Sequence, residues 1–188
     1  MITEVRSMAG HHIVLEPLSE VHRNDLKGAL DCDEEHWRIL PRSGAGEHLS
    51  GYWQAIRGNG RIPFGVRSLF DGSMLGTSSY SGIDAANATL EIRATWFGPE
   101  HRGTVVNAEA KLLMLSHAFE AGGERVQFSV DARNVGSRRA VAKLGATEEG
   151  LLRSTMTTWT GHRRDTVVFS MLRSEWQAVR AGLLQRLA

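Results

Sequence analysis

The sequence is poor in cysteine, since Cys32 is the only one among its 188 residues. An intrachain disulfide is therefore excluded, and so is a zinc site built on several cysteines. Eight histidines are present, but His11 and His12 are adjacent and the others are scattered. No pair stands at helical spacing beside carboxylates, which is the pattern of a metal-binding helix. We expect no metal site.

Long apolar runs and an excess of one charge are also lacking. No 18 apolar residues run together, and residues 1–10 contain no apolar core of signal-peptide length. We therefore expect a cytoplasmic protein without a membrane partner. Lysines and arginines number 22 against 21 aspartates and glutamates, and a net charge of +1 gives no reason to expect nucleic-acid binding. The length suits one domain over residues 1–188.

Apolar periodicity and turn residues predict a mixed α/β domain. Strands are expected over residues 12–18, 63–70, 74–83, 89–96, 126–130, 153–159 and 165–171. Helices are expected over residues 20–30, 46–57, from 105 to the glycine pair 122–123, over 134–144, and after a cap at Ser174. The fourth and fifth strands are joined through a helix, so we expect them to be parallel.

The rest of the chain is organised around residues 96–113. Gly98 and Pro99 end a strand there, and a helix follows whose apolar positions are Val105, Ala108, Leu112, Leu115 and Phe119. The first turn of a helix has unpaired N–H groups and the positive end of a dipole, so it can hold an anion. Arg102, Gly103 and Thr104 stand beside it. A plain strand–helix connection with a surface arginine explains the same residues.

The fourth strand alternates in polarity. Leu90, Ile92, Ala94 and Trp96 are expected on one face, which belongs to the core, and Glu91, Arg93 and Thr95 on the other. This polar face is either solvated or lines a site.

An acidic segment at residues 31–37 also has two interpretations. It is either a solvated connection between helices or a wall of the acceptor site, with carboxylates that attract an amine and Trp37 packing on it. Cys32 within it is expected to be a small, buried apolar group rather than a nucleophile.

Two motifs resemble one family. Arg102-Gly103-Thr104-x-x-Asn107, followed by Glu109-Ala110, resembles the pyrophosphate loop of the GNAT N-acetyltransferases, in their RimJ/RimL-like branch. The family pattern places small residues where this chain has Val105 and Asn107. The run Asn134-x-x-Ser137 followed by residues 143–146 resembles the GNAT segment after the fifth strand, whose helix touches the CoA arm.

The resemblance implies a GNAT-like three-layer α/β fold, in which the parallel strands four and five bracket the cofactor-binding helix. It implies transfer of an acetyl group from acetyl-CoA, as cosubstrate, to a primary amine of a protein N-terminus or a small molecule. The residues it assigns to acetyl-CoA are Trp96, Phe97, Arg102, Gly103, Thr104, Val105, Val106, Asn107, Asn134 and Ser137. A backbone N–H near Trp96 and Phe97 would stabilise the oxyanion.

The chemistry also needs a base and an acid. Glu91 is the candidate base, although pairing with Arg93 explains it equally well. Many relatives carry a tyrosine acid at the position of Val141, which cannot donate a proton. Ser137 is the substitute that the branch suggests, and Tyr52 and Tyr80 are the only tyrosines. Asn134 is equally well explained as a helix cap.

Other functions remain open from the sequence. The domain is alternatively a non-catalytic acyl-CoA-binding module, since its loop and acid positions depart from the pattern. A nucleotide-phosphate site is not supported, because no Gly-Lys-Ser/Thr follows Gly103. Protein N-termini, aminoglycosides, polyamines and amino acids are all open as acceptors, and so is a homodimer.

Overall fold

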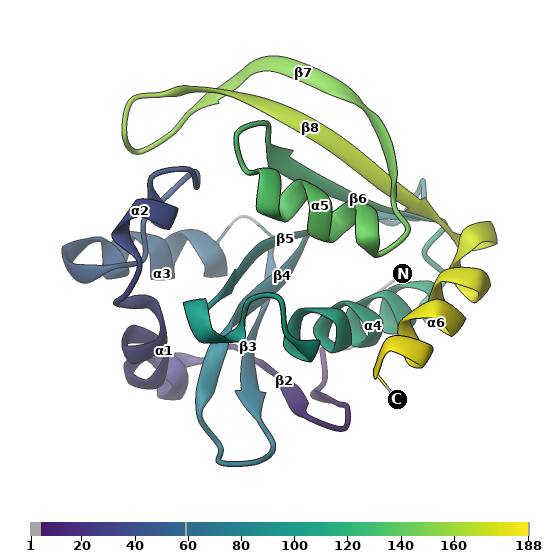
Figure 1. Ribbon diagram of the computed structural model, residues 1–188, viewed down its shortest axis with the longest axis horizontal. Coiled ribbons are helices and arrows are strands. Elements are labelled where there is room, and N and C mark those ends of the chain that lie inside the picture. The colour runs from purple at the N-terminus through teal and green to yellow at the C-terminus, as the bar shows by residue number, and fades with distance from the viewer. Residues whose placement is uncertain (1–4, 59, 188) are drawn as a thin grey trace.

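The computed structural model describes residues 5–58 and 60–187, and its strands form one mixed sheet (Figure 1). The sheet order is β1-β2-β3-β4-β5-β6-β8-β7. The strands are β1 (Met8–Ala9), β2 (Ile13–Pro17), β3 (Ile62–Ser68), β4 (Met74–Asp84), β5 (Thr89–Phe97), β6 (Arg125–Asp131), β7 (Thr147–Thr157) and β8 (Arg163–Leu172).

Helices cover both faces of this sheet. They are α1 (Arg23–Leu30), α2 (Glu34–Trp37), α3 (Leu49–Arg57), α4 (Val105–Glu120), α5 (Val135–Lys143) and α6 (Arg173–Leu187). Helices α1 to α3 share one buried apolar cluster with Met74 and Trp96, whereas α4 and α6 share a second, larger cluster with Ile92 and Phe128. The three-layer α/β fold expected from the sequence is confirmed.

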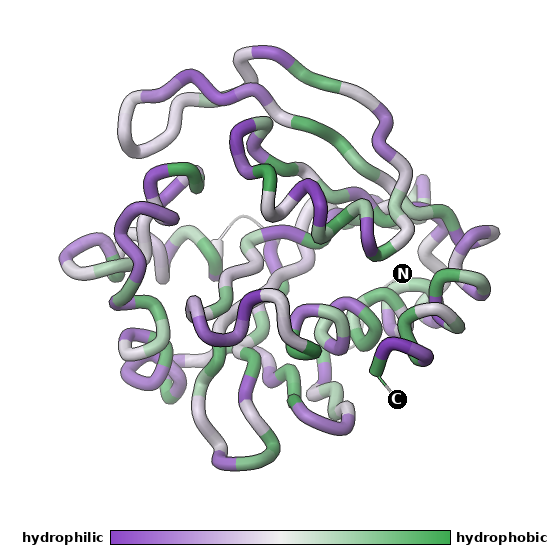
Figure 2. The backbone as a smooth tube through the Cα atoms, in the orientation of Figure 1, coloured by the Kyte–Doolittle hydropathy of each residue, from purple (hydrophilic) through white to green (hydrophobic). Residues whose placement is uncertain are grey.

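Hydropathy follows these layers. Figure 2 shows a hydrophobic run in the middle of β8, where Val167 and Phe169 join the larger cluster. The outer edge strand β7 is instead exposed along almost its whole length. None of the helices within the described residues is long and apolar enough to cross a membrane.

Strands β5 and β6 are parallel, as the strand–helix–strand spacing predicts, but they pair over a short distance only. Their register joins Thr89 to Arg125, Leu90 to Val126 and Glu91 to Gln127. The two strands continue for several residues beyond this point without pairing, while β4 and β8 stay paired to their outer edges. The sheet therefore opens between β5 and β6 after Glu91.

A bulge in β5 corrects the predicted faces of that strand. Ala94 has a positive φ of 50°, and the register against β4 shifts between Thr77 and Ser79. A bulge inserts one unpaired residue and re-aims the side chains that follow. Trp96 therefore lies in the cluster of α1 to α3, whereas Thr95 faces α4, which is the reverse of the expected arrangement.

Three other boundaries differ from the sequence prediction. Val105 is 38% exposed, because the buried face of α4 is centred on Ala110 and Met114 rather than on the predicted stripe. Strand β7 begins at Thr147, earlier than expected, since glycine and charged residues fit an exposed edge strand. Helix α6 follows β8 directly, so Ser174 lies inside the helix and is not its cap.

Candidate active site

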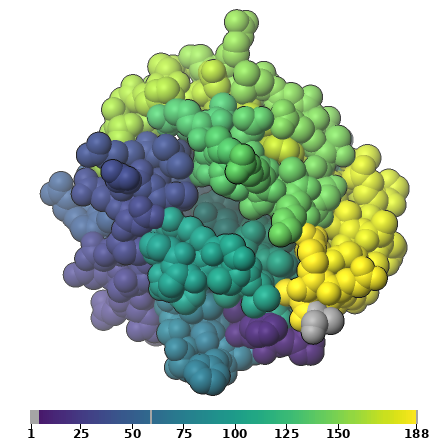
Figure 3. Space-filling model, viewed as in Figure 1, coloured from purple at the N-terminus to yellow at the C-terminus, as the bar shows by residue number. Residues whose placement is uncertain are grey.

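A pocket of about 650 Å³ lies where β5 and β6 separate. Figure 3 shows a hollow in the middle of the visible face, between α4 and α5. The pocket is lined by the free part of β5, by the end of β6, by α5, by one side of α4 and by the segment from α2 to α3. A volume of this size is typical of a small-molecule site.

The start of α4 forms one end of the pocket. Gly103 has a φ of +74°, a left-handed conformation that glycine adopts without strain. Thr104 is the N-cap: its hydroxyl accepts a hydrogen bond from the Val106 N–H at 3.3 Å and donates one to the His101 carbonyl at 2.7 Å. The Thr104 hydroxyl is thus engaged within the protein. The other N–H groups of the first turn provide the anion-binding potential.

Arg102 does not extend freely beside this helix. Its Nη1 pairs with Asp33, its Nε donates to the Phe97 carbonyl at 2.9 Å, and its guanidinium lies 4.5 Å from the centre of the Trp96 ring. The hydrogen bond from Arg102 holds the pKa of Asp33 below its usual range. The Nη2 of Arg102 is buried without a hydrogen-bond partner among the described residues. Arg102 therefore joins the loop, α2 and the end of β5.

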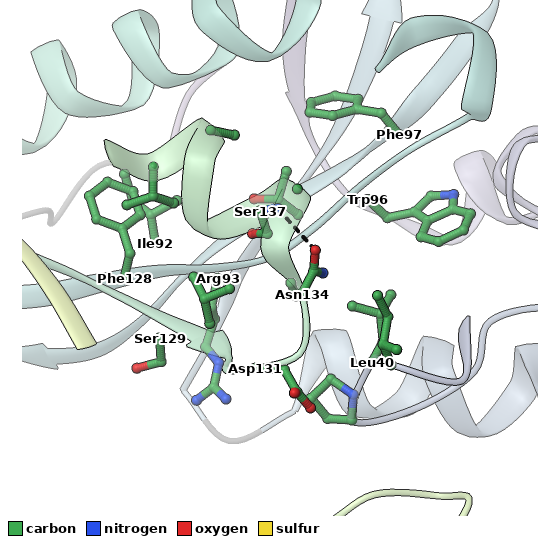
Figure 4. A pocket seen from close by; sticks show the side chains of 18 of the residues that line it. Leu40, Ile92, Arg93, Trp96, Phe97, Phe128, Ser129, Asp131, Asn134 and Ser137 are labelled. Atoms are coloured by element: carbon green, nitrogen blue, oxygen red, sulfur yellow. Dashed lines mark hydrogen bonds between the residues drawn. The ribbon is translucent and has the colours of Figure 1, made fainter. Parts of the chain in front are cut away.

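Helix α5 supplies the wall nearest the free strand ends (Figure 4). The Asn134 side chain accepts a hydrogen bond from the Ser137 N–H at 2.9 Å, so capping accounts for Asn134 while the residue also lines the pocket. Ser137 is partly exposed to the pocket. Val141, at the position where relatives carry tyrosine, is buried in the pocket wall and has no proton to donate.

The two tyrosines are held elsewhere. The Tyr80 hydroxyl donates to the Met114 carbonyl at 2.6 Å and lies inside the larger core. Tyr52 lines the pocket, but its hydroxyl is 3.1 Å from that of Thr77, and burial raises its pKa to about 12. Neither tyrosine is placed to replace the missing acid at Val141.

Glu91 lies at the last residue pair that joins β5 and β6. Its Oε2 is 3.4 Å from Arg93 Nη1, while its Oε1 is buried without a hydrogen-bond partner in the described part of the chain. Glu91 is thus at the base of the opening, not in the pocket wall. Pairing with Arg93, the alternative that the sequence leaves open, occupies one of its two oxygens.

Aromatic side chains form the wall opposite α5. Trp37 stacks on Trp96 with ring centres 3.7 Å apart, and His36 lies 5.2 Å from Trp96. Burial, and then the charge of Arg102, lower the pKa of His36, so this imidazole is neutral near pH 7. The indole of Trp159, from the β7–β8 hairpin, donates to the Trp37 carbonyl at 2.9 Å. Trp37 and His36 therefore line the site, as the functional interpretation of residues 31–37 anticipates.

The carboxylates of that acidic segment behave differently from the expectation. Glu34 and Glu35 are exposed and do not line the pocket, and Asp33 is paired with Arg102. Cys32 is half-buried, its thiol donates to the Ala29 carbonyl at 3.4 Å, and burial raises its pKa. The surroundings of Cys32 do not activate it as a nucleophile.

Lys111 is a buried amine that no motif in the sequence singles out. It projects from α4 and donates to the hydroxyls of Thr95 at 2.6 Å and Ser78 at 3.0 Å. Burial lowers its pKa to about 7. The only sign of it in the sequence is a lysine among the alanine, leucine and methionine residues of a central helix.

Arginines line the face of the opening that is turned away from α4. Figure 4 shows the guanidinium of Arg93 on the same side of the strands as Ser129 and Asp131, whereas Ile92 and Phe128 lie on the other side. Arg42, Arg61 and Arg164 line the same pocket. No spacing in the sequence indicates this group, because its members come from four distant segments.

The structure brings most of the predicted site residues to one place. Those that line the pocket are Trp96, Phe97, Arg102, Gly103, Asn107, Asn134 and Ser137. Those outside its lining are Glu91, Thr104, Val105 and Val106, and the last of these is buried in the core. Among the described residues, no group of three or more His, Cys, Asp or Glu side chains is placed to hold a metal ion.

Comparison with known proteins places these features in a family. Residues 12–147 match the family model described as an acetyltransferase (GNAT) domain. YdaF of Bacillus subtilis (strain 168), whose name suggests a ribosomal N-acetyltransferase, is 31% identical over 110 residues, which cover 58% of this chain and 59% of YdaF. The chain thus spans less than two thirds of that relative.

Solved structures extend the match over the whole chain. A crystal structure from T. thermophilus, whose description suggests an acetyltransferase, is 36% identical, has a TM-score of 0.90 and is covered completely, as is this chain. RimJ of Mycobacterium smegmatis, solved in complex with CoA-disulfide, shares the fold with a TM-score of 0.76 at 22% identity, over 97% of this chain and 91% of RimJ.

Proposed function

Because the chain belongs to the GNAT acetyltransferase family, in its RimJ/RimL-like branch, we propose that it moves an acetyl group from acetyl-CoA directly to a primary amine. The amine is that of a protein N-terminus or of a small molecule. The observation that carries the proposal is the opening of the sheet beyond Glu91 and Gln127, with a pocket between the free strand ends.

The donor fits the opening on physical grounds. Backbone N–H and C=O groups along the β6-facing edge of residues 92–97 have no strand partner there, so they are available to an amide-containing arm. The pyrophosphate would meet the first turn of α4, at residues 103–107. Arg102, through Asp33 and Trp96, holds this loop in place. The solved RimJ complex, with a CoA derivative, supports the same assignment by analogy.

The reaction joins the amine nitrogen to the thioester carbon and breaks the bond from that carbon to sulfur. The carbonyl oxygen becomes an oxyanion during attack, and a free N–H of β5 near the bulge at Ala94 is suited to stabilise it. Glu91, with one unpaired oxygen among the described residues, accepts the proton of the amine through water. Ser137, in the wall formed by α5, helps to return a proton to the departing thiolate.

A turnover assay tests the proposal. Purified protein is incubated with acetyl-CoA and a panel of primary amines, and free thiol is measured with and without each amine. We expect thiol release that depends on amine, with the acetylated amine confirmed by mass. The Glu91→Gln variant, purified identically, controls for contaminating enzymes. CoA binding without amine-dependent thiol release would indicate the non-catalytic acyl-CoA-binding module instead.

A further inference from the structure

Unpaired polar atoms gather on one face of the opening. Among the described residues, the buried side-chain atoms without a hydrogen-bond partner include Ser79 Oγ, Ser81 Oγ, Glu91 Oε1 and Arg164 Nε. The register pairs Ser79 with Arg93 and Ser81 with Glu91, so these side chains share the face turned toward α1 to α3. Buried polar atoms are almost always paired in folded proteins, so such a cluster indicates a site for a polar ligand.

Arg164 is the most buried member of the arginine group. Only 4% of the residue is exposed, and it lines the pocket. Its Nη2 donates to the Ser129 carbonyl at 3.2 Å, whereas its nearest carboxylate, that of Asp131, is 4.0 Å from Nε. Asp131 is already bound in a bidentate pair by Arg133, at 2.9 and 3.0 Å. No carboxylate in the described chain is therefore free to neutralise Arg164 closely.

Two further guanidiniums surround Arg164. Arg93 has only the 3.4 Å contact with Glu91, and Arg61 donates to the Ala55 carbonyl at 2.9 Å. Burial, and then the charge of Arg93, lower the pKa of Arg61; burial and Arg93 also lower that of Arg164, which Asp131 partly offsets. The three cations thus repel one another across the pocket. Arg42 adds a fourth, more exposed one.

Guanidiniums that share a partly dry pocket are costly unless an anion pairs with them, and their planar fork suits a carboxylate. On this basis, and resting on the acetyl-transfer function above, we propose that the acceptor amine carries a carboxylate held by Arg93, Arg61 and Arg164. The positive pocket disfavours polyamines and aminoglycosides, whose additional ammonium groups would be repelled. Amino acids, and peptides with an acidic side chain beside their N-terminus, fit.

The pyrophosphate of acetyl-CoA does not account for these arginines. Its proposed seat, the first turn of α4, packs against the opposite face, where Lys111 meets Thr95 and Ser78. Arg93 and Ser129 extend to the other side of the strands (Figure 4). The guanidinium group therefore belongs to the acceptor side.

Matched pairs of amines test the proposal. Rates are measured at saturating acetyl-CoA for γ-aminobutyrate against its amide, and for the peptide amides Ser-Asp-Ala against Ser-Asn-Ala. We expect kcat/KM to favour the carboxylate member by about tenfold or more, since an ionic hydrogen bond is lost in the neutral one. A preference within the first pair indicates a free amino acid, and within the second a peptide.

Variants remove the effect of differing amine basicity. Arg93→Met should abolish the preference for the carboxylate member while leaving the rate with the neutral member unchanged. Arg38→Met, at an exposed arginine that pairs with Glu34 and does not line the pocket, should leave both unchanged. Thermal melting checks that the variants fold.

The outcomes separate this inference from the proposed function. Amine-dependent turnover with no carboxylate preference, or a preference that survives Arg93→Met, overturns the inference and leaves acetyl transfer intact. If no amine reacts, calorimetry on the CoA-saturated protein decides. Tenfold tighter binding of the carboxylate member supports the anion site without the reaction, and equal or absent binding of both members overturns the anion site.

Discussion

The two faces of β5 differ in how their polar groups are satisfied. On the α4 face, the Lys111 amine, the Thr95 hydroxyl and the Ser78 hydroxyl bond to one another within 3.0 Å. On the other face, Ser79, Ser81 and Glu91 leave buried oxygens unpaired within the described residues. One bulge at Ala94 separates the two arrangements. The satisfied face stabilises the fold, and the unsatisfied face is the one that has binding capacity left for an acceptor.

The largest expected effect is on the unsatisfied face. An alkyl ammonium with a pKa near 10 must lose a proton before it attacks, and a positioned base typically contributes about 10²–10⁴-fold. Glu91→Gln should therefore lower kcat by about that factor at pH 7, with little change in acetyl-CoA binding, and lose less at high pH. Glu47→Gln, at an exposed residue outside the pocket, is the control. Wild-type rates for Glu91→Gln at pH 7 would shift attention to the neutral His36.

The satisfied face should respond in stability rather than rate. Burial holds the pKa of Lys111 near 7, against 10.5 for the unfolded chain. Between these pH values the unfolded chain binds more protons, so the free energy of unfolding rises with pH, by up to about 1.4 kcal/mol per unit. Lys111→Met should remove this rise.

Denaturant unfolding between pH 7 and 9.5 measures the effect, over a range that lies about between the two pKa values. The difference between wild type and Lys111→Met cancels the other titrating groups, and Lys27→Met, at an exposed lysine of α1, should keep the wild-type slope. An identical slope in Lys111→Met would mean that Lys111 stays charged in the folded protein.

Arg102 connects the two faces, and its expected effect is smaller. Arg102→Ala should weaken CoA binding by about tenfold in calorimetry, because ionic hydrogen bonds of this kind are worth about 1.5–3 kcal/mol. If Arg102 acts by positioning the loop through Asp33, then Asp33→Asn should weaken binding too. Asparagine tolerates the left-handed backbone at this residue, where φ is 53°. Unchanged binding in Asp33→Asn together with weaker binding in Arg102→Ala would indicate direct phosphate contact.

Ser137→Ala should give the smallest change. A thiolate leaves readily, so loss of an assisting hydroxyl should lower kcat by about tenfold at most and alter the alkaline limb of its pH profile. Unchanged kcat and an unchanged limb would mean that the thiolate leaves unassisted or through water.

Local signals in the sequence predicted most of the fold. Strand and helix order, the parallel pair β5–β6, the glycine stop after α4 and the cap at Asn134 all follow from spacing and turn residues. The faces of β5 could not be predicted beyond Ala94, because period-two alternation assumes a regular strand and the bulge depends on pairing with β4.

The site was less predictable for a similar reason. The contacts of Arg102 depend on Asp33, which is 69 residues away in the chain. The cationic face joins Arg61, Arg93 and Arg164 from three strands or their ends, and only the sheet order brings them together. The motif residues 102–107 were found because they are contiguous, although packing alone decides that Val106 turns into the core.

The division of the opening into a donor side and an acceptor side is tested most directly by the kinetics of Arg93→Met. Initial rates are measured with acetyl-CoA varied at saturating carboxylate amine, and then with the amine varied at saturating acetyl-CoA. The account predicts that KM for the amine rises by about tenfold while KM for acetyl-CoA stays at the wild-type value. A rise in KM for acetyl-CoA, with KM for the amine unchanged, would contradict it.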